Sequence, residues 1–557
     1  MSDLENFNNI YANLAESAYN GRPMNFPYES LKKKQKEILD SGKSLQFSYS
    51  ENALNKKGEV QVRGGTNLPN DGVVYLQPDK TVHTEEVRTN LQVPNPNGGY
   101  QTDTYVTNTY QKGLLTDEQA GFNAYFVTDT PKLNKETKET YLAVRGSDAF
   151  SMDTLNDWVS NDGNFALTNA YIPQAKLANQ ALISKIKEIK EQAPQAKLNV
   201  TGHSLGTIVS AQAVAKLYQE HPKSFDTIGQ VVLFDGPDVT QSLKKMGLSD
   251  KEIKAAGEKV TYYVNPFDMV SMLNRTAPYE KQFGHVNVIV PVHFSTSFDK
   301  MSSHDFGEFQ MDAHGKPLSA SKSFHPEMLT AGHQLAQLIE RSISKIEAVG
   351  VTGITTSAIL TALSGGVSAL VALGMTAAQA KSIYDDFNKD YQGIVSEANK
   401  KAKAWNAEHI PDYQNRIRSA SGSQKVELRV ELLQSVAQDA MIRSEEFTTE
   451  VKTELSEALE QVQKEIISGV QAAHNVAHHL DVWEVNGLLS DFTISHFWDT
   501  GVEESTKEAA KNYQTEIEEF SATLMKIGQN IEQVDSQGAA GFNSLMNQTK
   551  VNWGATK

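Results

Sequence analysis

The chain has 557 residues, more than the ~100–250 of one ordinary domain, so two domains are expected. A formal net charge of -16, with no basic stripe carrying interleaved aromatic residues, excludes broad electrostatic binding to nucleic acid. Because the sequence has no cysteine, disulfides, thiolate metal sites and cysteine nucleophiles are excluded as well.

The N-terminal part of the chain carries few regular patterns. Its start, MSDLENFNNIYANLAESAYN, has no basic segment followed by an apolar core, so we expect no cleavable signal peptide. Residues 1–120 are rich in Asn, Gly and Thr and are interpreted as an irregular lead-in to a sheet. Export of a protein with this start requires a route that does not depend on a signal peptide.

Between about residues 122 and 309, β-branched and aromatic runs alternate with helical patterns, which is typical of a mostly parallel sheet. Residues 171–190 have the apolar spacing of a helix. The predicted strands are AYFVT, TYLAVRG, KLNVTG, QVVLFDG, KVTYYVN and VNVIVPV. We therefore predict an α/β domain over residues 1–335.

From about residue 328 onward, Pro nearly vanishes and Ala, Glu, Lys, Gln and Ser dominate in helical periods. One apolar stripe indicates a long amphipathic helix, which needs a partner helix to cover it. Its members recur at intervals of three or four residues: Phe447, Val451, Leu455, Leu459, Val462, Ile466 and Val470. We predict an elongated all-α domain over residues 336–557.

Two features of this helical half have alternative interpretations. The uncharged stretch 348–380 exceeds the about 20 residues that span a bilayer, but its glycines and hydroxyls favour close helix packing or a hairpin covered by a partner. His474, His478 and His479 lie on one helix face and are interpreted as packing residues. No metal site and no cofactor are predicted.

The strongest chemical signal is Gly202-His203-Ser204-Leu205-Gly206, between the predicted strand KLNV and a helix-like segment. This context is the one that the GxSxG motif requires, because a sharp strand-to-helix turn projects the serine Oγ outward. The motif predicts a serine acyl hydrolase of the α/β-hydrolase type, with Ser204 as the nucleophile.

A serine nucleophile needs a histidine to take its proton and a carboxylate to orient that histidine. After Ser204, the acid candidates are Asp235, Asp238 and Asp268; the first two also fit a turn that closes a strand, and the position after the next strand favours Asp268. The base is predicted to be His304, in a polar loop after the last strand. The other histidines that follow Asp268 are His285, His293, His314, His325 and His333.

Donors for the tetrahedral oxyanion are also required. The backbone N–H of Leu205 is one candidate, because it directly follows the nucleophile. A second donor is expected in the loop after an earlier strand, where Arg145-Gly146-Ser147 ends TYLAVRG.

The segments AVRGSDAFSMDTLNDWVSND and VTGHSLGT resemble the class 3 (fungal-type) lipase family over roughly residues 120–309. The resemblance implies that Ser147 supplies an oxyanion donor and that a lid begins near Trp158. It also implies that VNPFDMVS carries the acid and SSHDFGEF the catalytic histidine. Thr207, in place of a second small residue, and a longer stretch between Ser147 and Trp158 depart from the family and affect the expected lid.

The whole chain resembles the lipase toxins of the staphylococcal type VII secretion system in which the lipase domain precedes a helical domain similar to the LXG domain. This resemblance implies a phospholipase A, acting at the sn-1 position of bacterial membrane lipids. It further implies export by the type VII route, small helical helper proteins on the C-terminal domain and an immunity protein on the lipase domain.

Three alternatives stay open from the residues alone. The enzyme could be a neutral acylglycerol lipase or a general carboxylesterase, since no motif separates these substrates. The α/β half could be an inactive hydrolase beside a helical binding protein, although Ser204, Asp268 and His304 together argue against this. The stretch 348–380 could instead make the chain a membrane-disrupting protein.

Overall fold

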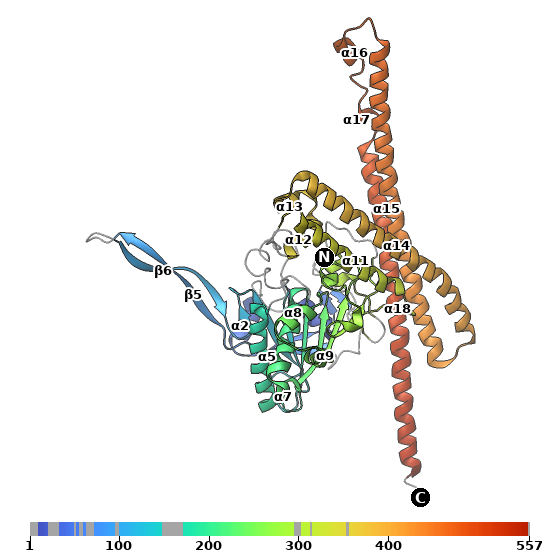
Figure 1. Ribbon diagram of the computed structural model, residues 1–557. Helices are drawn as coiled ribbons and strands as arrows, with labels where there is room; N and C mark the ends of the chain where they lie inside the picture. Colours follow the sequence, from blue (N-terminus) through green and yellow to red (C-terminus); the bar gives the residue numbers. More distant parts are fainter. Residues whose placement is uncertain are drawn as a thin grey trace. The chain divides into compact units, whose positions relative to one another are not determined.

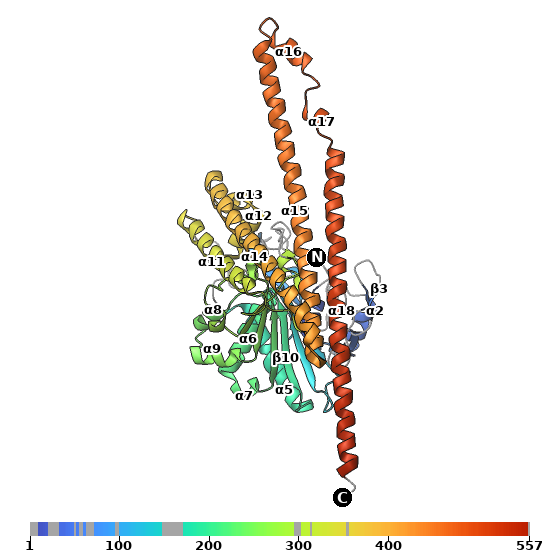
Figure 2. The same cartoon turned by 90° about the vertical axis from the view of Figure 1, so that its right-hand side faces the viewer.

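The computed structural model describes residues 9–19, 33–49, 52–54, 60–62, 72–94, 100–146, 171–293, 302–311, 315–351 and 356–554. The chain divides into two compact units, Met1–Ala398 and Asn399–Lys557. The domain boundary that the sequence suggests, between residues 335 and 336, stays a prediction. Figures 1 and 2 show the elements of both units, and each unit is described by itself.

A parallel sheet forms the centre of the first unit. Its strands lie side by side in chain order: β9 (Glu139–Val144), β10 (Lys197–His203), β11 (Ile228–Phe234), β12 (Val260–Val264) and β13 (His285–Val288). The residues of β9, β10 and β11 are mostly buried, as in parallel strands that are covered on both faces. The predicted α/β class with a mostly parallel sheet is therefore confirmed.

The sheet continues on one side through antiparallel strands, and here the structure differs from the predicted irregular lead-in. The long hairpin of β5 and β6 pairs from His83↔Lys112 to Pro94↔Tyr100, and its residues are mostly exposed. Polar residues on both faces leave no hydrophobic alternation, so the usual strand signal is missing. The strands of this part are β1 (Leu45–Ser48), β4 (Val73–Leu76), β5 (His83–Pro94), β6 (Tyr100–Lys112), β7 (Thr116–Asp117) and β8 (Phe122–Thr128), with a separate pair, β2 (Asn52–Leu54) and β3 (Val60–Val62).

Helices cover the sheet. Helix α1 packs Ile10 and Leu14 against Tyr141 and Ala143 of β9, while α6 packs against β9, β10 and α5. Within the described residues up to 272, the α-helices are α1 (Ile10–Ser17), α2 (Lys33–Asp40), α5 (Pro173–Gln192), α6 (Leu205–Glu220), α7 (Pro222–Phe225), α8 (Thr240–Lys245), α9 (Asp250–Gly257) and α10 (Met269–Met272). Short 3-10 turns follow at η3 (Tyr279–Lys281), η5 (Ser302–His304) and η6 (Phe306–Glu308).

The apolar stretch 348–380 is divided among several helices. These are the end of α11 (Pro326–Ala348), α12 (Thr356–Gly365), α13 (Val367–Ala372) and the start of α14 (Ala377–Ser419). Among the residues that the structure describes, no helix has both the length and the apolar character needed to cross a bilayer.

The second unit is helical, as predicted from residues 336–557. It contains α15 (Gly422–Val476), α16 (Val482–Leu488), α17 (Ile494–Phe497) and α18 (Thr500–Gly554). The 55 residues of α15 correspond to a length of about 80 Å. Helix α18 is the partner that packs along α15 (Figure 2). Thr448 Oγ1 donates to the Ala510 carbonyl at 3.2 Å, and the rings of Phe447 and Tyr513 meet edge to face.

Candidate active site

Ser204 lies at the sharp turn between β10 and α6. Its backbone has φ 56° and ψ -126°, a combination that is rare outside glycine and is found at strained functional turns. The two flanking glycines allow the chain to come close to itself. A Cβ at Gly202 would lie 2.7 Å from the Gly206 carbonyl oxygen, and one at Gly206 would lie 2.4 Å from that of Val144. The motif therefore has a steric basis in the fold.

Three side chains from distant parts of the sequence meet at the carboxyl end of the parallel strands. His304 Nε2 lies 2.9 Å from Ser204 Oγ, and His304 Nδ1 lies 2.7 Å from Asp268 Oδ2. Ser204 follows β10, Asp268 follows β12, and His304 belongs to η5. All three are at most 4% exposed. The structure thus brings together the serine, histidine and aspartate that the sequence singled out.

Asp268 is held by backbone donors as well as by the histidine. It caps α10, where its two carboxylate oxygens accept hydrogen bonds from the N–H groups of Val270, at 3.0 Å, and Ser271, at 2.8 Å. Such donors stabilise the charged form of a buried carboxylate. Asp268 can therefore hold a negative charge behind the imidazole.

The environment of His304 raises its pKa above the ordinary value. Burial lowers this pKa, but the charge of Asp268 and the hydrogen bond to that carboxylate raise it by more, and the charge of Asp305 contributes in the same direction. With the Nδ1 proton donated to Asp268, the Nε2 lone pair faces the hydroxyl of Ser204. That tautomer is the one that can accept the serine proton.

One candidate oxyanion donor, Leu205, lies within the described residues, and another lies outside them. Leu205 begins α6, and a backbone N–H in the first turn of a helix has no acceptor within that helix. Ser147 and the lid residue Trp158 both lie in the segment that the structure leaves undescribed. Thr207 donates from Oγ1 to the Ser204 carbonyl at 2.6 Å, so it braces the turn from within the helix.

Other candidates from the sequence lie outside this cluster. His285 is on β13 and is exposed. His325 is fully buried before α11, with Nδ1 2.6 Å from Glu327 Oε1. Asp238 accepts hydrogen bonds from the N–H and hydroxyl of Thr240, which is the turn chemistry that its sequence suggested.

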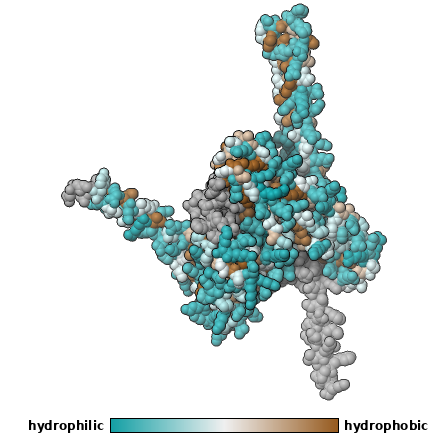
Figure 3. Space-filling view, viewed as in Figure 1, coloured by the Kyte–Doolittle hydropathy of each residue, from teal (hydrophilic) through white to brown (hydrophobic). Residues whose placement is uncertain are grey.

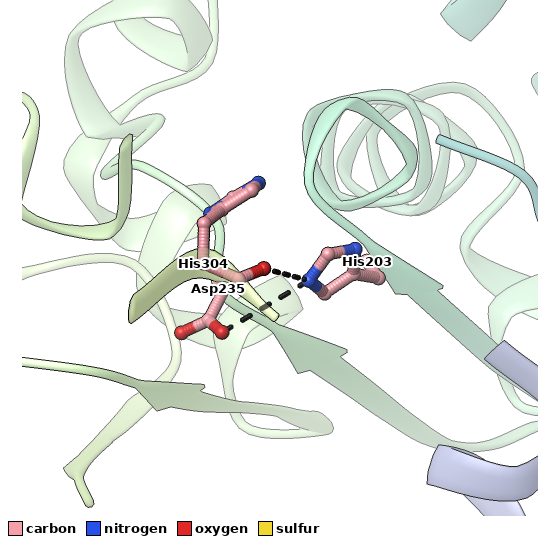
Figure 4. Close-up of side chains that lie close together, drawn as sticks. All are labelled: His203, Asp235 and His304. Carbon is pink, nitrogen blue, oxygen red and sulfur yellow. Dashed lines mark hydrogen bonds and ion pairs between the residues drawn. The ribbon is translucent and has the colours of Figure 1, made fainter. Parts of the chain in front are cut away.

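Two residues that sequence reasoning missed support the backbone of His304. His203, the variable residue of the motif before the serine, has Nε2 3.0 Å from the His304 carbonyl oxygen. Its Nδ1 lies 2.8 Å from the hydroxyl of Tyr19, just after α1. Nothing in the local sequence signals a contact between residues so far apart along the chain. Figure 4 shows the ring of His203 directed at the carbonyl of His304.

His203, Asp235 and His304 also lie close enough to hold one metal ion, since their ligand atoms fall within 4.8 Å of one another. Both ring nitrogens of His304 are, however, already engaged by Asp268 and Ser204. A metal here would have to displace one of these contacts, so we assign no metal to the three residues.

The fold around Ser204 is that of an α/β hydrolase. Residues 141–276 match the family model described as lipase (class 3). The matched segment runs from β9 past Asp268, so it includes the nucleophile turn and the acid loop but ends before His304. A comparison with curated proteins found none that matches the chain. The first unit therefore contains a class 3 lipase domain, and the chemistry of that class is ester hydrolysis.

Proposed function

We propose that the chain is a serine lipase that hydrolyses acyl esters of membrane lipids. The observation that carries this proposal is the continuous contact from Ser204 Oγ through His304 to Asp268, at a strained turn between strand and helix. A buried arrangement of these three groups activates a hydroxyl that is otherwise a weak nucleophile.

In the proposed reaction, His304 Nε2 takes the proton of Ser204 as Oγ bonds to the ester carbonyl carbon. The N–H of Leu205 and, as the family resemblance implies, Ser147 stabilise the oxyanion. The alcohol leaves with the proton from His304, and the acyl group stays on Ser204. A water molecule then gives one proton to His304 as its oxygen, which keeps the other proton, bonds to the acyl carbon. The bond between that carbon and Ser204 Oγ breaks, Oγ takes the proton from His304, and the fatty acid is released.

A fluorophosphonate probe tests the nucleophile directly, because it forms a stable bond with an activated serine. We expect labelling of the wild-type protein and its loss in Ser204→Ala. Ser242→Ala, which changes a buried serine on α8, is the matched control and should label normally. Labelling that persists without Ser204 would contradict the assignment.

For the substrate, we propose phospholipid cleaved at the sn-1 position. The resemblance to lipase toxins with the lipase domain first supports this choice over a neutral acylglycerol or a soluble ester. Defined phosphatidylglycerol carrying different acyl chains at the two positions, a triacylglycerol and a short-chain ester should be offered in parallel, with products identified by mass. Release of the sn-2 chain, or activity on the short ester alone, would overturn the proposal.

We also propose that the protein is an antibacterial toxin exported by the type VII route, with helical helper proteins bound to its second unit. Exposed apolar side chains where α15 turns towards α18 support a partner there, since solvent-exposed apolar groups favour interaction sites (Figure 3). Val476 is 77%, Trp483 72% and Leu488 77% exposed. Loss of the protein from the medium of a producing strain after inactivation of the type VII apparatus is the expected result, and undiminished export would contradict it.

An immunity protein that binds the lipase domain belongs to the same proposal. Because such a protein must protect the producing cell from the enzyme, it should block access to Ser204. Coexpression of the neighbouring genes in turn, followed by probe labelling of Ser204, identifies it. The expected result is one gene product that suppresses labelling; if none does so, the immunity proposal is wrong.

A further inference from the structure

Behind the three residues of the proposed mechanism lies a second buried carboxyl group, that of Asp235. This residue follows β11 and is 0% exposed. Its backbone has φ 49°, in the left-handed region where Asp and Asn are among the few tolerated side chains. Figure 4 shows its carboxyl group near His203 and the backbone of His304. The reaction described above gives it no role.

The hydroxyl of Ser271 lies between Asp235 and Asp268. Ser271 Oγ is 2.8 Å from Asp235 Oδ1 and 2.5 Å from Asp268 Oδ2. Both distances are those of hydrogen bonds, and each hydrogen bond needs its own proton. A serine hydroxyl has one proton, whereas an ionised carboxylate has none to give. Two full hydrogen bonds at these distances are therefore satisfied when one of the two carboxyl groups carries a proton.

The surroundings of the two carboxyl groups identify the one that carries the proton. Asp268 accepts backbone N–H bonds from Val270 and Ser271 and a third bond from His304 Nδ1, all of which favour its charged form. Asp235 accepts one backbone bond, from Asn265 at 2.9 Å, and its Oδ2 has no hydrogen-bond partner among the described residues. Burial raises the pKa of Asp235 well above its ordinary value, and the nearby charge of Asp268 raises it further.

We propose that Asp235 is a positioning residue that stays protonated at neutral pH and donates from Oδ1 to Ser271, whose hydroxyl in turn donates to Asp268. The chain of hydrogen bonds then runs from Asp235 through Ser271, Asp268 and His304 to Ser204. It supplies Asp268 with a donor without placing a second negative charge behind the imidazole. A second charge would raise the proton affinity of His304 and convert it to imidazolium, which cannot accept the serine proton.

The other charged or titratable groups near these hydrogen bonds do not donate a hydrogen bond to Asp235 that could take the place of its proton. His203 Nε2 is 3.9 Å from Asp235 Oδ2, beyond hydrogen-bond distance. The buried Arg275 donates to the carbonyls of Ser271 and Gly236, both at 2.7 Å, and to the amide oxygen of Gln282. Asp305 adjoins His304 in the chain and acts on it through its charge. None of these contacts is a hydrogen bond to the carboxyl group of Asp235.

Infrared spectroscopy of the whole protein at neutral pH tests the proton itself. A protonated carboxylic acid has a C=O stretching band that a carboxylate lacks. When the spectrum of Asp235→Asn is subtracted from that of the wild type, one such band should remain. The spectrum of Asp268→Asn should still contain this band. Ser271→Ala should shift the band, because the acid loses its acceptor. If Asp235→Asn loses no such band, the proposal is wrong.

The dependence of kcat/KM on pH tests whether a protonated Asp235 leaves the pKa of His304 unchanged. This second experiment rests on the proposed function, because it requires ester hydrolysis. Asp235→Asn, which suits the left-handed backbone, should lower kcat roughly threefold to tenfold and leave the midpoint of the acid limb in place. Ser271→Ala removes a donor from a charged acceptor and should raise that midpoint by about one pH unit. Ser242→Ala should change neither quantity.

A downward shift of about one pH unit or more in Asp235→Asn would mean that a negative charge had been removed, and the proposal would be wrong. The two arms separate the possible failures. If the protein hydrolyses no ester, the proposed function fails, yet the infrared band still decides whether Asp235 carries a proton.

Discussion

The hydroxyl of Tyr391 donates a hydrogen bond to the carbonyl oxygen of Phe267 at 3.1 Å. Both residues are at most 2% exposed, and Phe267 directly precedes Asp268. Helix α14 is thereby fastened to the loop that carries the acid of the candidate site. The position of that carboxylate depends in part on a helix that lies more than one hundred residues further along the chain.

Tyr391→Phe should destabilise the first unit and reduce activity. The change leaves the carbonyl of Phe267 without this donor, which costs about 1–3 kcal/mol for a buried polar group. Denaturant unfolding followed by tryptophan fluorescence and circular dichroism measures the loss, and kcat measures the effect on the acid loop. Tyr384→Phe on the same helix is the control. Equal stability of the two variants would show that the contact with Phe267 contributes nothing.

Asp268→Asn should lower kcat by about 10³- to 10⁴-fold with a small change in KM. The amide has nearly the same shape but carries no charge, and it can favour the histidine tautomer that presents a proton to Ser204. Steady-state hydrolysis of a chromogenic ester measures this effect. A loss of less than tenfold would mean that another carboxylate orients His304.

The raised pKa of His304 predicts where activity disappears on acidification. His304 must be neutral to take the serine proton, so kcat/KM should fall as pH decreases through a midpoint above the ordinary histidine value of about 6.5. The protonated histidine also stabilises the fold below its unfolded-state pKa, and this contribution is lost as pH rises through the folded-state pKa. A pH profile of kcat/KM gives the midpoint. A midpoint below 6.5 would contradict the prediction, and removal of the Asp268 charge should shift it downward.

Gly236→Ala should destabilise the nucleophile turn. A Cβ at Gly236 would lie 1.9 Å from Oγ1 and 2.5 Å from Cβ of Thr207, so one side chain would have to move. We expect a loss of about 1–3 kcal/mol in the free energy of unfolding, with weaker probe labelling of Ser204. Thr207→Gly removes both contacting atoms. The double variant should therefore lose less than the sum of the two single losses, and strict additivity would exclude the clash.

Much of the site could be predicted from the sequence, because local sequence patterns indicate its chemistry. GHSLG after an apolar strand predicts a nucleophile turn, and the order of strands then places Asp268 and His304 at the same edge of a parallel sheet. Their catalytic roles stay predictions. Ser147 and Trp158, which the family resemblance supplied, lie outside the described residues.

The remaining features depend on contacts that leave no periodic trace. The hairpin β5–β6 has polar residues on both faces, so neither hydrophobic alternation nor composition revealed it. The bond from Tyr19 to His203 joins positions 184 residues apart. Asp235 resembled an ordinary turn residue, because VVLFDGPD does not show that Ser271 will pack beside it.

The contact between Tyr19 and His203 has a practical consequence for work on the catalytic half alone. The segment that matches the family model, residues 141–276, contains neither Tyr19 nor His304. A fragment trimmed to that segment would lose both His304, the proposed base, and the N-terminal support for His203, which adjoins the proposed nucleophile. The smallest piece that can be cloned with a complete site must therefore begin before α1 and extend beyond η6, more than twice the matched length.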